Sequence, residues 1–259
     1  MTYSLIAMDM DGTFLDENGN VPPDFLTLYP KLRSLGLSFT PSSGRQLATL
    51  REMFGHLGAE LNYIAENGAV VVAAGKIVDT TSLAKETVHR VLAAVQGYPT
   101  HLDLVVCEPE MAYLIPPQPA PVHKYYHAIT HVSDLAAVIG DNIIKLAIYC
   151  PADSQAVAAA FQKLVPEAAV VASAPDWVDI MHPEANKGRA LEKLSAALDI
   201  PLAETIAFGD YLNDYELLEV AGTSYAMANA HPDLLAIADH IAPANTENGV
   251  MRVLTELLL

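Results

Sequence analysis

Residues 5–13, with the sequence LIAMDMDGT, constrain the fold more than any other part of the chain. The first half is a short apolar run without helical or alternating periodicity, which favours a strand buried on both faces of a parallel sheet. The run stops at Asp9, and ligands of open α/β sheets bind beyond the carboxyl ends of the strands. Asp11 and Gly12 follow, and glycine permits a sharp turn that brings the backbone close to a ligand. We therefore expect an α/β protein with a functional site at this turn.

The chemistry of this turn depends on its two carboxylates. Asp9 and Asp11 would repel one another unless a cation or a proton lay between them. Mg²⁺ prefers oxygen ligands, so the pair is a candidate metal site. The two groups can also divide labour, one as nucleophile and the other as general acid and base. A solvated turn without function is the alternative for an isolated Asp-x-Asp.

The composition limits the partners of the chain. It has 259 residues, of which 52% are hydrophobic, so it can bury one large core or two modest ones. Lys plus Arg number 14 and Asp plus Glu number 31, which gives a net charge of −17. Nucleic acids and anionic membranes need a positive surface, so both are disfavoured as partners. A small phosphorylated metabolite remains compatible, because a metal and a few local cations can hold it.

The cysteines and the hydropathy pattern indicate a cytoplasmic protein. Cys107 and Cys150 are too few for a disulfide framework and suit buried positions in a reducing compartment. No basic segment followed by an apolar core opens the chain, and no apolar run approaches the ~20 residues of a membrane span. The oligomeric state cannot be read from these features.

Two later segments carry features of an anion site. A strand expected over residues 37–41 ends in the string Ser-Ser-Gly-Arg, which contains Ser43, Gly44 and Arg45. A hydroxyl and free backbone N–H groups at a strand-to-helix turn can bind an anion, although an ordinary helix cap would look the same. Further on, Lys187 begins a helix, where a cation is unfavourable unless an anion lies nearby.

A third segment repeats the pattern of a buried strand that ends at an aspartate. Residues 205–209 are apolar and lead into Asp210, and Asn213 and Asp214 follow before the next helical pattern. Two capping aspartates at a helix start are the structural alternative.

Local patterns divide the chain into two parts. Residues 81–181 contain alternating, half-exposed strands and helices of an α+β unit, inserted into a domain made of residues 1–80 and 182–259. Within this insert, residues 122–129 are expected to form a helix. In the first domain, Pro30 is expected to kink or interrupt a helix that ends near Leu35.

Taken together, the strings DMDGT, SSGR, NKG and GDYLND resemble, in order and spacing, the four motifs of the haloacid dehalogenase superfamily. Details such as ENGA at residues 66–69 resemble the Cof-like phosphatases of that superfamily. The resemblance implies a Rossmann-like parallel sheet core with an inserted α/β cap. It covers nearly the whole first domain, whereas the insert matches in position and type more than in sequence.

The resemblance also implies roles for individual residues. Asp9 would be the nucleophile, Asp11 the general acid and base, and Lys187 the clamp on the phosphoryl group. Substrate phosphate would be bound by four residues, which are Ser43, Gly44, Arg45 and Asn213. The Mg²⁺ ion would be held by Asp9, the backbone carbonyl of Asp11, and Asp210, with Asp214 supporting this set.

The function expected from this resemblance is a Mg²⁺-dependent phosphatase. It would hydrolyse small phosphate monoesters, foremost sugar phosphates, through an aspartyl-phosphate. A phosphomutase carries the same four motifs and stays open as an alternative. A phosphate-sensing or partner-binding protein without catalysis is a second one, since a fold does not fix a function.

Overall fold

The computed structural model describes residues 3–117 and 122–257, and the described chain forms two compact units. The first unit consists of Met1–Gly44, Gly55–Asp79 and Asn186–Leu259. The second consists of Arg45–Phe54 and Thr80–Ala185. The sequence-based division had placed the segment Arg45–Phe54 with the first part of the chain, and the structure groups it with the second.

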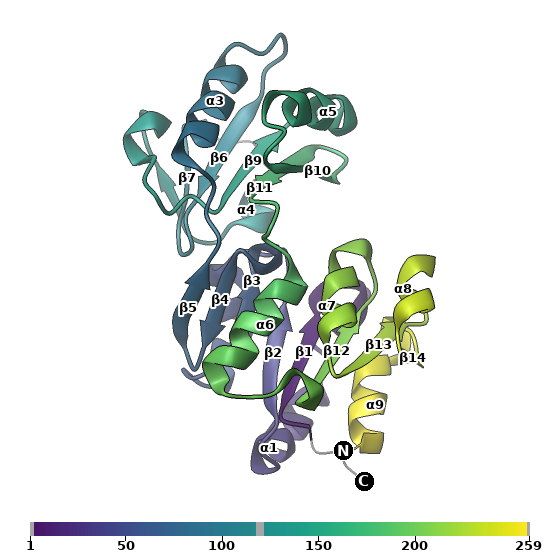
Figure 1. Ribbon diagram of the computed structural model, residues 1–259. Coiled ribbons are helices and arrows are strands. Elements are labelled where there is room, and N and C mark those ends of the chain that lie inside the picture. The colour runs from purple at the N-terminus through teal and green to yellow at the C-terminus, as the bar shows by residue number, and fades with distance from the viewer. Residues whose placement is uncertain (1–2, 118–121, 258–259) are drawn as a thin grey trace. The chain divides into compact units, whose positions relative to one another are not determined.

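An eight-stranded sheet organises the first unit (Figure 1). Its strand order is β14-β13-β12-β1-β2-β3-β4-β5. The strands are β1 (Leu5–Asp9), β2 (Ser38–Ser42), β3 (Tyr63–Ala65), β4 (Val70–Ala73), β5 (Lys76–Thr80), β12 (Thr205–Gly209), β13 (Thr223–Met227) and β14 (His240–Ala242). The strands from β14 to β3 pair in parallel, and β4 is antiparallel to β3.

The position of β1 explains where the site forms. All five of its residues are buried, and the strand pairs in parallel with β2 on one side and β12 on the other. Asp9 lies opposite Ser42, the last residue of β2, and Met8 lies opposite Phe208 near the end of β12. The carboxyl ends of three central strands therefore meet at one edge of the sheet, which confirms the expected α/β fold.

Five helices and several short turns complete the first unit, and α6 and α7 lie on one face of the sheet (Figure 1). The helices are α1 (Phe25–Ser34), α6 (Lys187–Leu198), α7 (Tyr215–Val220), α8 (Pro232–Ile237) and α9 (Gly249–Leu257). The turns are η1 (Met10–Phe14), η2 (Gly55–Leu57), η3 (Glu66–Gly68), η5 (Leu202–Glu204), η6 (Leu212–Asp214) and η7 (Asn245–Glu247).

Pro30 was expected to kink or interrupt its helix, and helix α1 continues through this proline without interruption. A proline removes one N–H donor and crowds the carbonyl of the preceding turn. Packing offsets this cost, because Phe25, Tyr29 and Leu32 are buried on one face of the helix. The rings of Phe25 and Tyr29 also pack against Phe39 of β2.

The second unit is built on a six-stranded sheet of order β10-β11-β9-β6-β7-β8. The strands are β6 (Asp103–Cys107), β7 (Ala112–Leu114), β8 (Ile129–His131), β9 (Lys145–Tyr149), β10 (Ala169–Ala174) and β11 (Trp177–Met181). The helical segments are α2 (Leu47–Phe54), α3 (Lys85–Gln96), α4 (Val122–Tyr125), α5 (Ser154–Leu164) and the turn η4 (Leu135–Val138).

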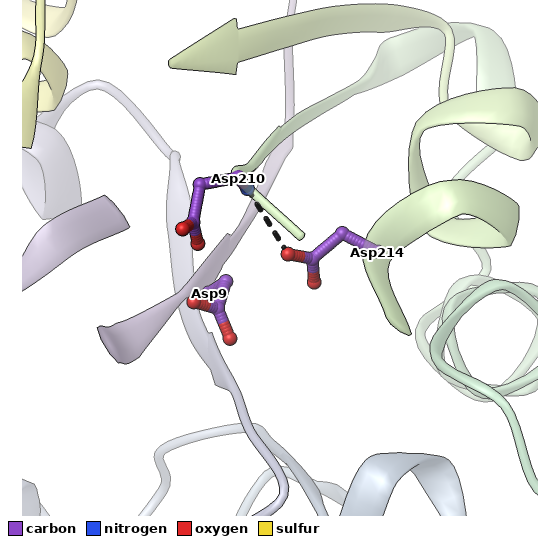
Figure 2. A group of neighbouring side chains, drawn as sticks. All are labelled: Asp9, Asp210 and Asp214. Carbon is purple, nitrogen blue, oxygen red and sulfur yellow. Dashed lines mark hydrogen bonds between the residues drawn. The ribbon is translucent and has the colours of Figure 1, made fainter. Parts of the chain in front are cut away.

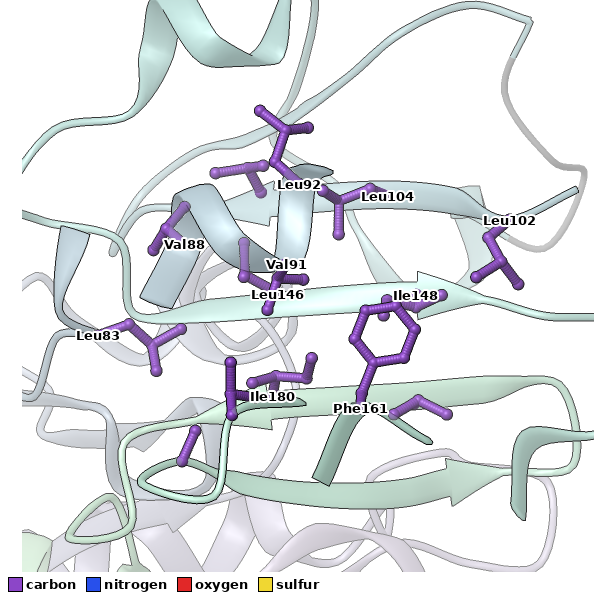
Figure 3. Close-up of a cluster of buried hydrophobic side chains, with 14 of the residues drawn as sticks. Leu83, Val88, Val91, Leu92, Leu102, Leu104, Leu146, Ile148, Phe161 and Ile180 are labelled. Carbon is purple, nitrogen blue, oxygen red and sulfur yellow. The ribbon is translucent and has the colours of Figure 1, made fainter. Parts of the chain in front are cut away.

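One hydrophobic cluster holds the second unit together (Figure 3). It joins α3 and α5 to the same face of the sheet, with Val91 and Phe161 from the helices packed near Leu146 and Ile148 of β9. Alternate residues of β9 therefore point into this cluster, as the period of a strand requires. Lys145 and Tyr149 belong to the opposite face of the same strand.

The helix predicted over residues 122–129 is only partly present. Helix α4 stops at Tyr125, and Ile129–His131 forms β8, which pairs in parallel with β7. The strand partner lies outside the sequence window, so local periodicity could not reveal it. No helix among the described residues is long and apolar enough to cross a membrane.

Candidate active site

Three aspartates meet at the carboxyl edge of the first unit's sheet (Figure 2). Asp9 ends β1, Asp210 directly follows β12, and Asp214 ends the turn η6. One carboxylate oxygen from each lies within 4.8 Å of the others. Asp9 is 6% exposed and Asp214 is fully buried, whereas Asp210 is half-buried. The cluster is thus open to solvent mainly on the side of Asp210.

A single ammonium group bridges two of these carboxylates. The Lys187 Nζ atom donates to Asp9 Oδ1 and to Asp214 Oδ1, both at 2.6 Å. Lys187 is the first residue of α6, and Asn186 caps that helix by accepting a hydrogen bond from the Arg189 N–H at 2.8 Å. The side chain is fully buried, so both ion pairs are shielded from water.

The charges around Lys187 do not balance. Three carboxylates face one ammonium, and burial disfavours every charged form. Burial raises the pKa of Asp9 well above its usual range even though Lys187 opposes this, and it raises the pKa of Asp210 to about 6. Burial alone would lower the pKa of Lys187, but the charges of Asp214 and Asp9 outweigh it and raise that pKa.

Asp214 serves as a structural support for this cluster. Its Oδ2 atom accepts hydrogen bonds from the backbone N–H groups of Asp210 at 3.1 Å and Tyr211 at 3.3 Å. A side chain at Gly209 would not fit, because a Cβ there would lie 2.5 Å from the Asp214 Cβ. Both oxygens of Asp214 are therefore engaged in holding Lys187 and the turn after β12.

The turn after β1 is fitted closely around Asp210. Gly12 has a φ of +83°, and a Cβ at this position would lie 2.3 Å from Asp210 Oδ2. The Thr13 hydroxyl donates to Asp210 Oδ1 at 2.9 Å, and the Asn229 side-chain amide donates to the Gly12 carbonyl at 2.8 Å. Asp11 is exposed between these fixed points.

The expected phosphate-binding residues gather around Asn67. Its N–H donates to the Ser43 carbonyl at 3.0 Å, and its Oδ1 atom accepts from the Asn213 side-chain amide at 3.1 Å. A Cβ on Gly44 would lie 3.0 Å from the Asn67 side-chain amide. Asn67 has a left-handed backbone with a φ of 52°, which asparagine tolerates better than most residues. The structure thus brings Ser43, Gly44 and Asn213 together.

Arg45 directly follows Gly44 in the chain. It belongs to the second unit, where its guanidinium Nη1 atom lies 3.8 Å from Met53 Sδ on α2. Three contributing residues, Thr13, Asn67 and Asn229, are not among the site residues predicted from the sequence. Thr13 lies in the DMDGT string, so the sequence pointed to its neighbourhood. Asn229 follows Gly12 by 217 positions, so no local pattern could reveal their contact.

The three aspartates fit a divalent cation. Hard cations such as Mg²⁺ take carboxylate oxygens, and Asp9 and Asp210 supply them at one open edge. A divalent cation would compensate the net negative charge of this largely buried place, where burial raises the pKa of Asp210. The donor set therefore suits a metal-binding site made of Asp9, Asp210 and the surrounding backbone.

Comparison with known proteins decides the family. The sequence profile of the haloacid dehalogenase-like hydrolases matches residues 6–254 of the chain, which is nearly its full length. The chain belongs to the haloacid dehalogenase-like hydrolases. The four motifs that suggested this family are the segments that meet at the site, and the predicted family and fold class are confirmed.

Relatives within this hydrolase family are similar over their whole length. The 5-amino-6-(5-phospho-D-ribitylamino)uracil phosphatase of Escherichia coli is 29% identical over 268 residues, covering 100% of this chain and 97% of that protein. The HMP-PP phosphatase of Cronobacter sakazakii is 29% identical, covering 91% and 88%. The predicted enzyme class, a phosphatase of this family, is confirmed by these matches.

Solved structures agree with this assignment. A protein of Eubacterium rectale matches with a TM-score of 0.87 and 27% identity, covering 98% of this chain and 99% of that one. A subclass IIB sugar phosphatase matches with a TM-score of 0.81 and 19% identity, covering 99% and 100%. At that identity the second likeness concerns the fold alone.

Proposed function

We propose that this hydrolase is a Mg²⁺-dependent phosphatase of small phosphate monoesters, foremost sugar phosphates, and that it works through an aspartyl-phosphate on Asp9. The observation that carries the proposal is the buried Asp9 carboxylate at the end of β1, held at 2.6 Å by Lys187 and placed beside Asp210. A carboxylate fixed in this way is pre-oriented for attack, because its rotamer and its environment are already set.

The chain's own residues account for the steps of hydrolysis. An oxygen of Asp9 attacks phosphorus, and the bond from phosphorus to the leaving oxygen breaks. Asp11 protonates that leaving oxygen and then takes a proton from the water that hydrolyses the acyl phosphate. Lys187 stays charged throughout and offsets the negative charge that develops on the phosphoryl oxygens.

Phosphate and metal are held by residues around these two carboxylates. Ser43, Gly44 and Asn213, gathered by Asn67, would contact the remaining phosphoryl oxygens, with Arg45 following in the chain. The metal would be held by Asp9, the Asp11 carbonyl and Asp210, while Asp214 supports Lys187 and the turn. When bound, Mg²⁺ would neutralise phosphoryl charge and hold the phosphate in line with the nucleophile.

Substrate choice is assigned to the inserted segment. In this proposal residues 1–80 and 182–259 form the catalytic domain, and residues 81–181 form a lid that contacts the leaving group and excludes water. The sugar-phosphate class is favoured by a relative whose substrate name contains a phosphoribityl group and by the fold neighbour named a sugar phosphatase. A phosphomutase stays as the alternative, because the residues around Asp9 suit both reactions.

A screen of phosphorylated metabolites tests the proposal directly. Phosphate release is measured with Mg²⁺ and with EDTA, for the wild-type protein and for Asp9→Asn, which keeps the shape but removes the attacking charge. We expect Mg²⁺-dependent release by the wild type and background release by the variant with its fold intact. Robust turnover by Asp9→Asn would remove Asp9 from the mechanism, and transfer of phosphate to a second sugar hydroxyl would identify a mutase.

A further inference from the structure

The segment that follows the phosphate-binding turn belongs to the second unit, where one buried side chain anchors it. Gln46 is 1% exposed, and it comes three residues after Ser43. Its Oε1 atom accepts hydrogen bonds from the backbone N–H groups of His127 and Ala128, both at 3.0 Å. Its Nε2 atom donates to the Ala128 carbonyl at 3.0 Å. Three of the four hydrogen bonds that a carboxamide can form are thus made to two adjacent residues.

These bonds lie where an edge strand begins. Ala128 directly precedes β8, the edge strand of the second unit's sheet, and its carbonyl also accepts from the Ala112 N–H of β7 at 3.0 Å. Gln46 therefore completes the backbone hydrogen bonding at the start of β8, in the place that a further strand would occupy. Its own main chain is fixed as well, because the Gln46 carbonyl accepts from the Leu50 N–H in the first turn of α2.

Two other contacts from α2 reach the same part of the second unit. Glu52 pairs with His127, and Arg51 pairs with Glu110 ahead of β7. All four side chains are at least 38% exposed, and ion pairs in water contribute little. Among these polar contacts, the buried carboxamide is therefore the one that contributes most to holding this end of α2.

Resting on the proposed function, we infer that Gln46 is a positioning residue for the reaction. It ties the turn that binds the substrate phosphate to the chain at His127 and Ala128. That chain directly follows Tyr126, whose ring lies 5.2 Å from the Lys145 ammonium on the sheet face opposite the hydrophobic cluster. Phosphate bound at Ser43 and Gly44 reduces the motion of the turn. Through the hydrogen bonds of Gln46, it also reduces the motion of His127 and Ala128, which follow Tyr126.

The chain offers a matched control for this residue. Gln162 on α5 also pairs with backbone in both directions, since its Nε2 atom donates to the Ala168 carbonyl at 3.1 Å and its Oε1 atom accepts from the Val170 N–H at 3.3 Å. It supports β10, the other edge strand of the same sheet. The hydrogen bonds of this control run to β10 and the residue before it, and not to the chain after the phosphate-binding turn, so it reports the structural effect alone.

Hydrogen exchange tests the inference without requiring turnover. Amide exchange at His127 and Ala128 is measured with Mg²⁺, with and without inorganic phosphate, in the wild type, Gln46→Met and Gln162→Met. We expect phosphate to slow exchange at both amides in the wild type and in Gln162→Met, and to have no effect in Gln46→Met. Phosphate that leaves the wild-type amides unchanged, or that protects them equally in Gln46→Met, would overturn the inference.

Kinetics supply the second readout. Gln46→Met is expected to raise the KM for the best ester found by the screen about tenfold, and that for a small aryl phosphate less than about threefold, because the small ester draws little energy from remote contacts. Gln46→Glu keeps the acceptor for both N–H groups but buries a carboxylate oxygen against the Ala128 carbonyl, so it should raise the KM at least as much as Gln46→Met.

The two proposals fail in different ways. If the wild type hydrolyses no ester but phosphate still protects the two amides through Gln46, phosphatase activity is wrong and the link from the phosphate site is right. If the wild type is active and Gln46→Met matches Gln162→Met on every ester, Gln46 has no positioning role.

Discussion

Replacing Lys187 by methionine tests the electrostatics of the site most directly. Methionine keeps an unbranched side chain of similar length in a fully buried position, so the change removes the charge with little change in packing. It leaves Asp9 and Asp214 facing one another without the ammonium that bridges them at 2.6 Å on each side. The expected consequence is a large loss of stability in the absence of a metal.

The size of the effect follows from the two short ion pairs. At an effective dielectric constant of about 20, each pair at this separation is attracted by about 6 kcal/mol, most of which desolvation offsets. Removing one partner of a buried pair typically costs about 3–5 kcal/mol, because the remaining charge stays buried without compensation. We therefore expect Lys187→Met to lower the free energy of unfolding by about 3–5 kcal/mol at pH 7.5.

Urea unfolding with EDTA measures this loss, and Lys193→Met is the control. Lys193 lies further along the same helix and pairs with Asp79 at 3.9 Å with 46% of its side chain exposed, so its replacement should cost less than about 1 kcal/mol. The variant's carboxylates should take up protons more readily, so the deficit should shrink toward pH 5 and grow as the pH rises. Equal losses in both variants would refute the proposed charge balance.

Three further predictions concern the turn after β1 and the metal. Gly12→Ala should lower Mg²⁺ affinity at least about tenfold, because its Cβ would displace Asp210. Gly19 also has a positive φ but lies in open space, so Gly19→Ala should leave Mg²⁺ affinity unchanged. Calorimetric titration of both variants with Mg²⁺ compares them. Because burial raises the pKa of Asp210 to about 6, a proton must leave before the metal binds, and Mg²⁺ affinity should fall about fivefold from pH 6 to pH 5; an affinity that does not change between pH 5 and pH 8 would contradict this. Asp11→Asn should slow sugar phosphate hydrolysis more than aryl phosphate hydrolysis in steady-state assays, since aryl oxides need little protonation; equal losses would assign Asp11 to the metal instead.

Local sequence patterns predicted the site residues whose positions are determined by the end of a strand. Asp9 and Asp210 each follow a buried apolar strand, and the parallel pairing of β1 with β12 brings them to one edge of the sheet. Lys187 could be singled out because a cation at a helix start is unfavourable by itself. Asp214, which pairs with Lys187, was given only a supporting role in the sequence analysis. In the structure, Asp214 also accepts two hydrogen bonds from backbone N–H groups.

The parts that could not be predicted depend on contacts between distant segments. The bond from Asn229 to the Gly12 carbonyl and the bonds from Gln46 to Ala128 follow no local period. The helix expected over residues 122–129 ends early for the same reason, because β8 pairs with β7. At Pro30 the helix forms although proline disfavours it locally, because burial of the neighbouring side chains outweighs that preference.

The central place of β1 has a consequence for the nascent chain. This strand is synthesised before its neighbour β12, whose first residue, Thr205, pairs with Leu5 in the register and follows it by 200 residues. At about 5–20 residues per second, β1 waits for roughly 10–40 seconds with one edge unpaired. Lys187, the partner of Asp9, is likewise synthesised only with α6. A chain that ends before that helix would carry a strand suited to burial, with an acid at its end that lacks its compensating ammonium.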